Sequence, residues 1–243
     1  MTDNGKQGTD TVEKNAQYFD RLVGDIAPVR SLHDELVALG TRIEYFPGAT
    51  SPETLNGDLW ATADWHHDES IWRLYFPVTA KAHAVYHEQL HARFKAVDGA
   101  PMMKTFPASD PLKESVGQLN NDLDHAYVVP REVAQYPEAA EYWEKDYKRF
   151  LGKIPSSGAV SLTQLQRKSD LLRAWLVLPV AMPDSPITQA FRAELVKDKW
   201  LDIGDEMSAR VQAAGADKVL AIHAFREALG RGFPPVGRVI FTH

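Results

Sequence analysis

The chain has 243 residues, of which 44% are hydrophobic and 25% charged, a composition typical of a globular protein with a sizeable core. It contains no cysteine, so disulfide bonds are excluded and any metal ion must be held by histidine and carboxylate side chains. The net charge of −6, the absence of a signal-peptide pattern and the lack of a long apolar run argue against a nucleic-acid or membrane partner. We therefore expect a cytoplasmic protein, whose oligomeric state the composition does not indicate.

Two helical stretches are predicted at the start of the chain. The polar residues 1–11 predict a disordered tail. Apolar side chains then recur every three or four residues over residues 12–26 and, after Pro28, over residues 29–40. Gly40 is a suitable residue to end the second of these helices.

A change from helical spacing to alternation predicts three strands and then another helix. The strands are expected at Thr41–Phe46, Asp58–Trp65 and Ser70–Phe76, the last two joined as a hairpin by a polar turn. A proline follows the third strand, and Thr79 is the expected N-cap of a helix that runs to about Val97.

This helix carries the pattern His-Glu-x-x-His at residues 87–91. Residues four apart lie on one face of a helix, so His87 and His91 can bind the same metal ion. Glu88 lies beside them and can act as a general base, accepting a proton from a water molecule on that metal. Zinc, Zn²⁺, is the default ion for imidazole and carboxylate ligands, although Mn, Co or Fe can use the same set. Catalysis also requires a third protein ligand and an open coordination position.

The order of three strands followed by a His-Glu-x-x-His helix resembles the zincin metalloproteases. The resemblance implies an α+β fold, with a small N-terminal sheet packed on the motif helix and a mainly helical C-terminal half. It also implies that the strand before the motif helix, here Ser70–Phe76, is an edge strand along which a peptide or protein substrate binds in extended form.

A second helix, predicted from about Leu112, supplies candidates for the third ligand. It contains Asn-Asp-Leu-Asp-His at residues 121–125, which resembles the Asn-x-x-Glu-Asp helix of thermolysin-like zincins (gluzincins), including many small bacterial members. That resemblance implies Asp124 as the third metal ligand, with Asp in place of the usual Glu and His125 in place of the usual Asp. His125 is the alternative ligand, or a catalytic residue that stabilises the oxyanion. Asp122 is a further candidate.

Other polar and aromatic side chains near the motif each have two interpretations. His83 is expected to pack under the sheet or to support a ligand, because one straight helix cannot supply three histidines to one metal ion. Tyr127 is expected in the core, the alternative being an oxyanion donor. Trp72 is expected in the core or against substrate, whereas His66 and His67, in the hairpin turn, are expected to be exposed.

The rest of the chain predicts helices, apart from an irregular stretch over residues 102–111 and a short terminal strand. The helices are expected at Glu138–Leu151, Leu162–Leu178, Ile187–Trp200, Ile203–Ala214 and Ala216–Leu229, and the strand at Gly237–Thr242. We therefore expect a metallopeptidase core over residues 12–135 and a mainly helical extension, packed on it, over residues 136–243.

Three functions are consistent with these patterns. The first is a zinc-dependent metallopeptidase that hydrolyses peptide bonds with Glu88 as general base. The second is a non-catalytic, metal-binding regulatory or adaptor protein with the same fold. The third is a helical interaction protein without a metal. The complete motif favours catalysis, because a purely structural metal site does not require Glu88.

Overall fold

The computed structural model describes residues 26–47, 62–66, 69–76, 80–106, 110–158, 161–230 and 238–242. This part of the chain is a mixed α and β protein in which helices predominate, in agreement with the predicted α+β class. The packing divides the chain into two compact units, Met1–Val97 and Asp98–His243. The predicted tail, the helical stretch ahead of Ile26 and the start of the second strand lie outside the described residues, as does Thr79.

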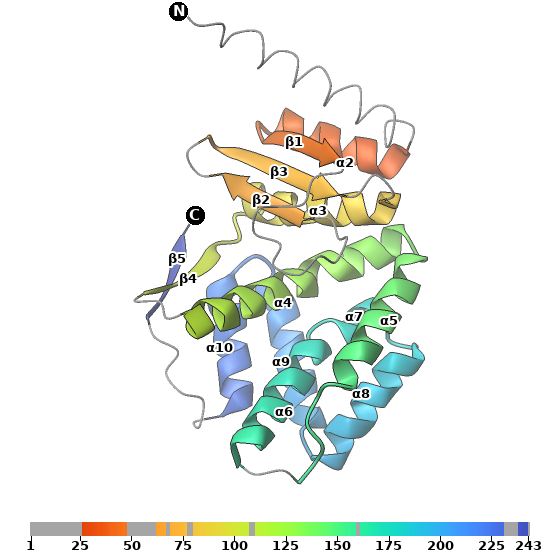
Figure 1. The fold of residues 1–243 in the computed structure, drawn as a ribbon, viewed down its shortest axis with the longest axis vertical. Helices are drawn as coiled ribbons and strands as arrows, with labels where there is room; N and C mark the ends of the chain where they lie inside the picture. The colour runs from red at the N-terminus through yellow and green to blue at the C-terminus, as the bar shows by residue number, and fades with distance from the viewer. Residues whose placement is uncertain are drawn as a thin grey trace, which may run out of the picture. The chain divides into compact units, whose positions relative to one another are not determined.

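The first unit contains a three-stranded sheet (Figure 1). Its strands are β1 (Arg42–Pro47), β2 (Thr62–His66) and β3 (Ile71–Phe76). β3 lies in the centre, where it pairs in parallel with β1 and antiparallel with β2. The predicted β2–β3 hairpin is therefore confirmed, but the prediction that Ser70–Phe76 forms an edge strand is wrong.

The side chains of β3 explain its central position. Five of its six residues are buried, which is the pattern of a strand covered on both faces. Leu74 is fully buried and Phe76 contacts Tyr45 of β1 edge to face, whereas Tyr75 stacks on Phe46. An edge strand that accepts a substrate needs a free row of backbone groups, and both sides of β3 are already paired.

Two helices, α2 (Ala27–Ala38) and α3 (Ala82–Ala96), pack beside each other and on the sheet. α2 ends where predicted, because Gly40 has a φ of +83° and its N–H bonds to the carbonyl of Val37 at 2.9 Å. The N–H of Thr41 bonds to the carbonyl of Leu36, also at 2.9 Å, which completes a Schellman motif. The predicted N-cap of α3 is wrong, since the residue before its first turn is Lys81.

The second unit is organised around α4 (Asp110–Gln135), a helix of 26 residues that contacts most other elements of this unit. Its other helices are α5 (Ala139–Leu151), α6 (Ser161–Trp175), α7 (Leu178–Ala181), α8 (Pro186–Lys197), α9 (Leu201–Ala214) and α10 (Lys218–Leu229). All five predicted C-terminal helices are confirmed, except that the helix predicted over Leu162–Leu178 ends at Trp175. Pro179 explains this early end, because proline cannot donate a backbone hydrogen bond to a preceding turn.

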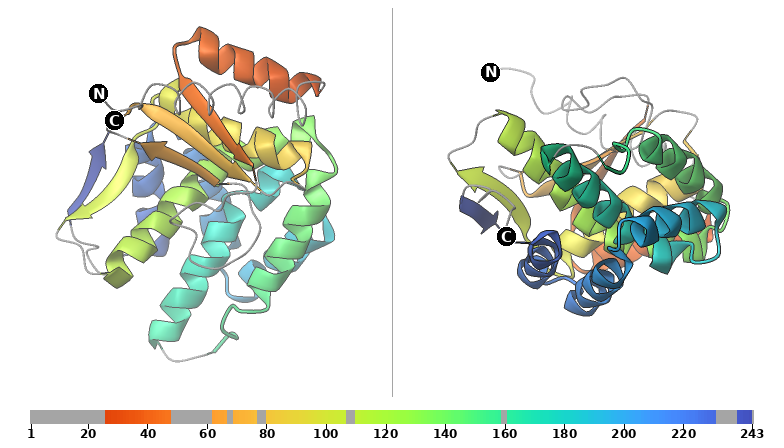
Figure 2. Two further views of the ribbon diagram at one scale, coloured as in Figure 1. Left: turned by 45° about the horizontal axis from the view of Figure 1, so that its top comes forward. Right: turned by 90° about the horizontal axis from the view of Figure 1, so that it is seen from below.

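A two-stranded antiparallel sheet joins the start of this unit to the end of the chain (Figures 1 and 2). β4 (Met102–Phe106) pairs with β5 (Arg238–Thr242) along their whole length. The terminal strand is thus confirmed, but the prediction of irregular structure over residues 102–111 is wrong. The strand forms through a partner far along the chain, which local sequence does not reveal.

A proline inside α4 marks the point where α9 is fastened to it. Pro130 has no N–H, so it leaves the carbonyl of Ala126, four residues earlier, without its helical donor. The side chain of Gln212 from α9 donates to that carbonyl at 3.0 Å. A bond between helices thus replaces one within the helix, which lets α4 continue through the proline.

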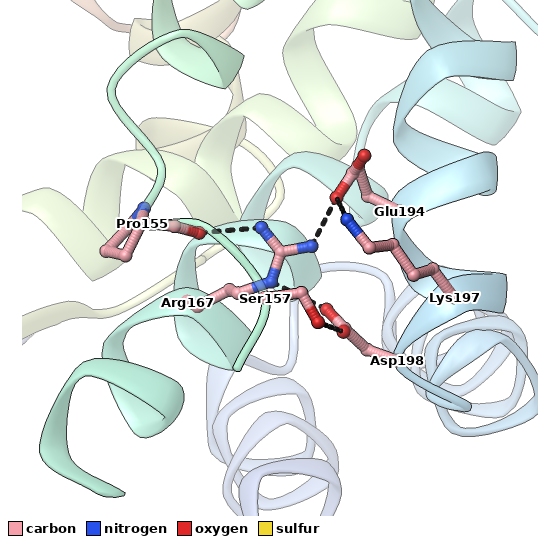
Figure 3. A network of polar contacts seen from close by, with 6 residues as sticks. All are labelled: Pro155, Ser157, Arg167, Glu194, Lys197 and Asp198. Carbon is pink, nitrogen blue, oxygen red and sulfur yellow. Dashed lines mark hydrogen bonds and ion pairs between the residues drawn. The ribbon is translucent and has the colours of Figure 1, made fainter. Parts of the chain in front are cut away.

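One buried cation ties α6 to α8 and to the loop between α5 and α6 (Figure 3). The guanidinium of Arg167 donates to Asp198 at 2.6 Å, to Glu194, and to the carbonyl of Pro155 at 2.7 Å. Ser157 also donates to Asp198, at 2.6 Å. Because Arg167 is almost fully buried, these charge-assisted bonds compensate its lost hydration.

None of the helices in the part of the chain that the structure describes combines the length and the apolar character that a bilayer crossing needs.

The close approach of α9 to α6 gives a first prediction. A Cβ added to Gly204 would lie 2.9 Å from Cδ1 of the buried Trp175, so we expect Gly204→Ala to lower the free energy of unfolding by about 1–3 kcal/mol. Gly117 in α4 is the matched control, because a Cβ there meets no atom within 4 Å. Gly117→Ala should stabilise the protein by about 0.5–1 kcal/mol. Equal effects of both changes in urea denaturation would contradict the close packing.

Candidate metal centre

The rotation of α3 about its axis is set by Gln89. This side chain is fully buried, and its Nε2 donates to the carbonyl of Val29 in α2 at 3.2 Å and to the hydroxyl of Tyr45 in β1 at 2.8 Å. Gln89 is two residues from both His87 and His91, which places it about 200° around the helix from each. The two imidazoles therefore project from the opposite side of α3 to the one bonded to α2 and β1.

The hydroxyl of Tyr45 extends this contact to α2. The hydroxyl, which carries one proton, accepts from Gln89 and lies 2.8 Å from Nδ1 of His33. Burial raises the pKa of Tyr45 above its usual value, so the phenol keeps this proton at neutral pH. The neutral bonds of Gln89 and Tyr45 thus hold α2, β1 and α3 together.

The two histidines of the motif meet as the sequence predicts. Nε2 of His87 lies 3.1 Å from Nε2 of His91, and their rings are inclined at 68°. A tetrahedral zinc ion with Zn–N bonds of about 2.0–2.1 Å separates two ligand nitrogens by about 3.3 Å. The pair therefore suits two positions of one metal ion, although a hydrogen bond between neutral imidazoles has a similar length.

The remaining polar residues of α3 are also buried. Glu88 is 7% exposed, and His87 and His91 are 6% and 7% exposed, so the whole motif is removed from bulk water. His83, one turn earlier, is 5% exposed, which agrees with its expected packed position. A buried carboxylate beside two imidazoles needs compensation by hydrogen bonds or a cation.

Asp124, the predicted third ligand, forms an ion pair within the second unit. Its Oδ1 is bound by the ammonium of Lys218 from α10, and both side chains are 1% exposed. The same ammonium donates to Oδ1 of Asn120 at 2.7 Å, one turn earlier on α4. The carboxylate of Asp124 is therefore already neutralised by a cation from the protein, and its role as a metal ligand stays a prediction.

Asp122, the further ligand candidate, is paired as well. Nε of Arg173 from α6 donates to Asp122 at 2.5 Å, and a second nitrogen of the same guanidinium lies 3.4 Å from Asp170. Burial raises the pKa of Asp122, while the charge of Arg173 and its hydrogen bond act in the opposite direction. Both acidic residues of the predicted ligand sequence thus pair with cations from later helices.

His125 has a different environment on the same helix. Its ring is half-buried and packs edge to face on Trp143 of α5, with 5.2 Å between ring centroids. Trp143 in turn donates from Nε1 to the buried Glu132 at 2.9 Å. This aromatic contact restricts the orientation of the imidazole.

Two aromatic side chains, Tyr127 and Trp72, have contacts that bear on their expected roles. The hydroxyl of Tyr127 donates to the carboxylate of Asp98, so its single proton is used there rather than on an oxyanion. Trp72 is 3% exposed, as expected of a core residue. The ammonium of Lys95 lies 5.4 Å from the centroid of its ring. The side chains of His66 and His67 lie outside the described residues.

Two residues that matter here were missed by sequence reasoning. Gln89 carries no pattern of its own, because its partners come from α2 and β1. Lys218 carries a usable signal, since it is in phase with the buried positions Ala221, Ile222 and Phe225 of α10. A lysine on the apolar face of a helix indicates a buried charge that needs an acidic partner.

Comparison with known proteins adds no assignment: no protein-family model matches the chain, and neither a curated protein nor a solved structure is significantly similar to it.

The contact between Gln89 and Tyr45 gives a second prediction. Gln89→Leu and Tyr45→Phe should each lower the free energy of unfolding by about 1–3 kcal/mol, because each leaves a buried polar partner without its bond. The double variant should lose less than the sum, with a coupling of about 0.5–3 kcal/mol. Gln189→Leu, at an exposed glutamine, is the matched control and should change stability by less than about 0.5 kcal/mol. Strict additivity in urea denaturation would show that the two side chains do not interact.

Proposed function

We propose that this chain is a zinc-dependent metallopeptidase of the zincin type. The carrying observation is the pair of buried imidazole nitrogens, 3.1 Å apart, with the carboxylate of Glu88 on the same helical turn. In this proposal His87 and His91 bind zinc and Glu88 is the general base. The cytoplasmic location expected from the sequence belongs to the same proposal.

The cost of burial supports a metal at this place. Two imidazoles and a carboxylate removed from water lose hydration that apolar neighbours cannot replace. A divalent cation compensates all three, since it accepts electron pairs from the two imidazoles and attracts the charge of Glu88.

For the third ligand we propose His125 in place of Asp124. The carboxylate of Asp124 is held by Lys218, and ligation would require this buried pair to separate. In this proposal the imidazole of His125 completes a ligand set of three histidines with His87 and His91. Three histidines and one open position are a known ligand set of catalytic zinc.

The proposed reaction is hydrolysis of a peptide bond. When bound, a zinc ion supplies Lewis acidity toward water and toward a carbonyl oxygen. Glu88 then accepts a proton from the attacking water and delivers it to the leaving amine. The bonds of Gln89 hold α3 so that the carboxylate of Glu88 stays beside the imidazole pair.

The central position of β3 changes the proposed site for an extended substrate. Among the strands that the structure describes, β2 has β3 as its one neighbour in the sheet. We propose that a peptide or protein substrate pairs with the other side of β2, adding a strand by main-chain hydrogen bonds. Neither nucleic acid nor a membrane is part of the proposal.

One observation favours the non-catalytic alternative. His87, Glu88 and His91 are all less than a tenth exposed, and a structural metal site is closed in the same way. In that case the metal would stabilise a regulatory or adaptor protein without turnover. The two predictions below separate metal binding from catalysis.

Metal binding is the third prediction. Purified protein should contain one zinc per chain by elemental analysis, and alanine at His87, His91 or His125 should weaken zinc binding by about 100-fold or more. His223→Ala, at an exposed histidine of α10, is the matched control and should bind zinc normally. If Asp124→Asn loses zinc while His125→Ala keeps it, the third ligand is Asp124. A wild-type protein that does not bind zinc contradicts the proposal as a whole.

Catalysis is the fourth prediction. Wild-type protein should cleave members of a peptide library, and Glu88→Gln should lower the rate by about 10²–10⁴-fold because the general base is lost. Zinc content, measured in the same samples, should be unchanged, which distinguishes a catalytic defect from metal loss. Zinc-loaded protein that cuts no peptide, or a Glu88→Gln variant that cuts as fast as wild type, would favour the regulatory function.

A further inference from the structure

We propose that Lys168 of α6 is a modification site, whose side-chain amine is acylated by donors with a good leaving group, such as acyl phosphates or acyl thioesters. Its amine lies against the last residue of α10 and against Trp200, which precedes α9. All of these residues belong to the second unit. The proposal therefore does not depend on the metal site.

The ammonium group of Lys168 has little to balance its charge. Nζ donates to the backbone carbonyl of Leu229 at 3.4 Å, which is longer than the usual range of about 2.7–3.2 Å. It also lies 5.9 Å from the centroid of the Trp200 ring. Lys197 differs, because its ammonium pairs with Glu194 at 3.7 Å. Within the described ranges of the chain, no carboxylate lies at ion-pair distance from Lys168.

This environment favours the neutral amine, which is the nucleophilic form of lysine. Lys168 is half-buried, and burial lowers the pKa of its ammonium group. A lysine that is desolvated without a carboxylate partner is an activated nucleophile. The amine is also within reach of a small reagent, unlike that of Lys218, which is 1% exposed and ion-paired. Lys168 thus combines access with activation.

The same surroundings suit the acylated product. A side-chain amide has one N–H group, which matches the one carbonyl acceptor supplied by Leu229. It carries no charge, so its partial burial costs less free energy than that of an ammonium group. The acyl chain adds apolar surface beside the ring of Trp200. A neutral imine, formed with an aldehyde, would lose the bond to Leu229 because it has no N–H.

The reaction is a simple acyl transfer. The neutral Nζ attacks the acyl carbon, and a C–N bond forms. The bond from that carbon to the phosphate oxygen or to the thioester sulfur breaks, and the leaving group keeps the electron pair. The surplus proton on nitrogen passes to water. Acylation removes a positive charge from the C-terminal end of α10, where a cation interacts favourably with the helix dipole.

The test measures the acetylation rate of every lysine in the full-length chain at neutral pH. Acetyl phosphate and a small acetyl thioester are used in separate arms, and mass spectrometry of proteolytic peptides gives the initial rates. Lys168 should react at least about threefold faster than Lys197 and Lys199, which are both exposed. The ratio should fall toward one as the pH approaches about 10.4, where a solvated lysine is half neutral.

A variant tests the cause of the reactivity. Gln164 is exposed and lies one turn before Lys168 on α6, so Gln164→Glu supplies the missing carboxylate at the i, i+4 spacing. It should slow acetylation of Lys168 at least about twofold and leave Lys197 unchanged. Gln189→Glu, at an exposed glutamine of α8, is the matched control and should slow neither lysine.

The outcomes separate activation from mere exposure. Faster reaction of Lys168 with either donor supports the proposal for that leaving group, and a rate no higher than those of Lys197 and Lys199 with both donors overturns it. A preference for Lys168 that persists unchanged at high pH, or that Gln164→Glu does not reduce, also overturns it, because access rather than activation would then set the rate.

Discussion

The hydrogen bonds of the buried Gln89 side chain fix the orientation of α3 about its axis. A helix that is buried on nearly all sides has no polar face to orient it, and hydrophobic packing alone would leave its rotation weakly defined. Gln89 removes this freedom because Val29 and Tyr45 accept its two N–H groups. With the rotation fixed, His87 and His91 must occupy the opposite side together. The orientation of the His-Glu-x-x-His motif therefore depends on the hydrogen bonds of Gln89.

In the second unit the corresponding constraint is charge. Arg167, Arg173 and Lys218 are each held by carboxylates from other helices, so the buried polar contacts are also the contacts that fasten those helices to one another. Each carboxylate used in this way is neutralised before any ligand arrives. The acidic residues of α4, which look like metal ligands in the sequence, therefore already have cationic partners within the second unit.

The local sequence pattern predicted much of the fold and, within the candidate site, the approach of His87 to His91. The spacing of apolar residues predicted α2, α3 and the C-terminal helices, and the spacing of His87 and His91 predicted their meeting. The errors concern long-range pairing. β4 exists because β5 lies beside it, and β3 is central because β1 joins its free side. Likewise, the sequence predicts Asp124 as a metal ligand, but in the structure its carboxylate pairs with Lys218 of α10.

The choice of third ligand has a chemical consequence beyond geometry. Three neutral imidazoles leave the full charge of +2 on a zinc ion, whereas a carboxylate ligand would reduce the net charge of the site to +1. The higher charge lowers the pKa of water more strongly and polarises a carbonyl more strongly. With His125 as the proposed third ligand, Asp124 keeps its pairing with Lys218 and its carboxylate adds no negative charge to the ligand set.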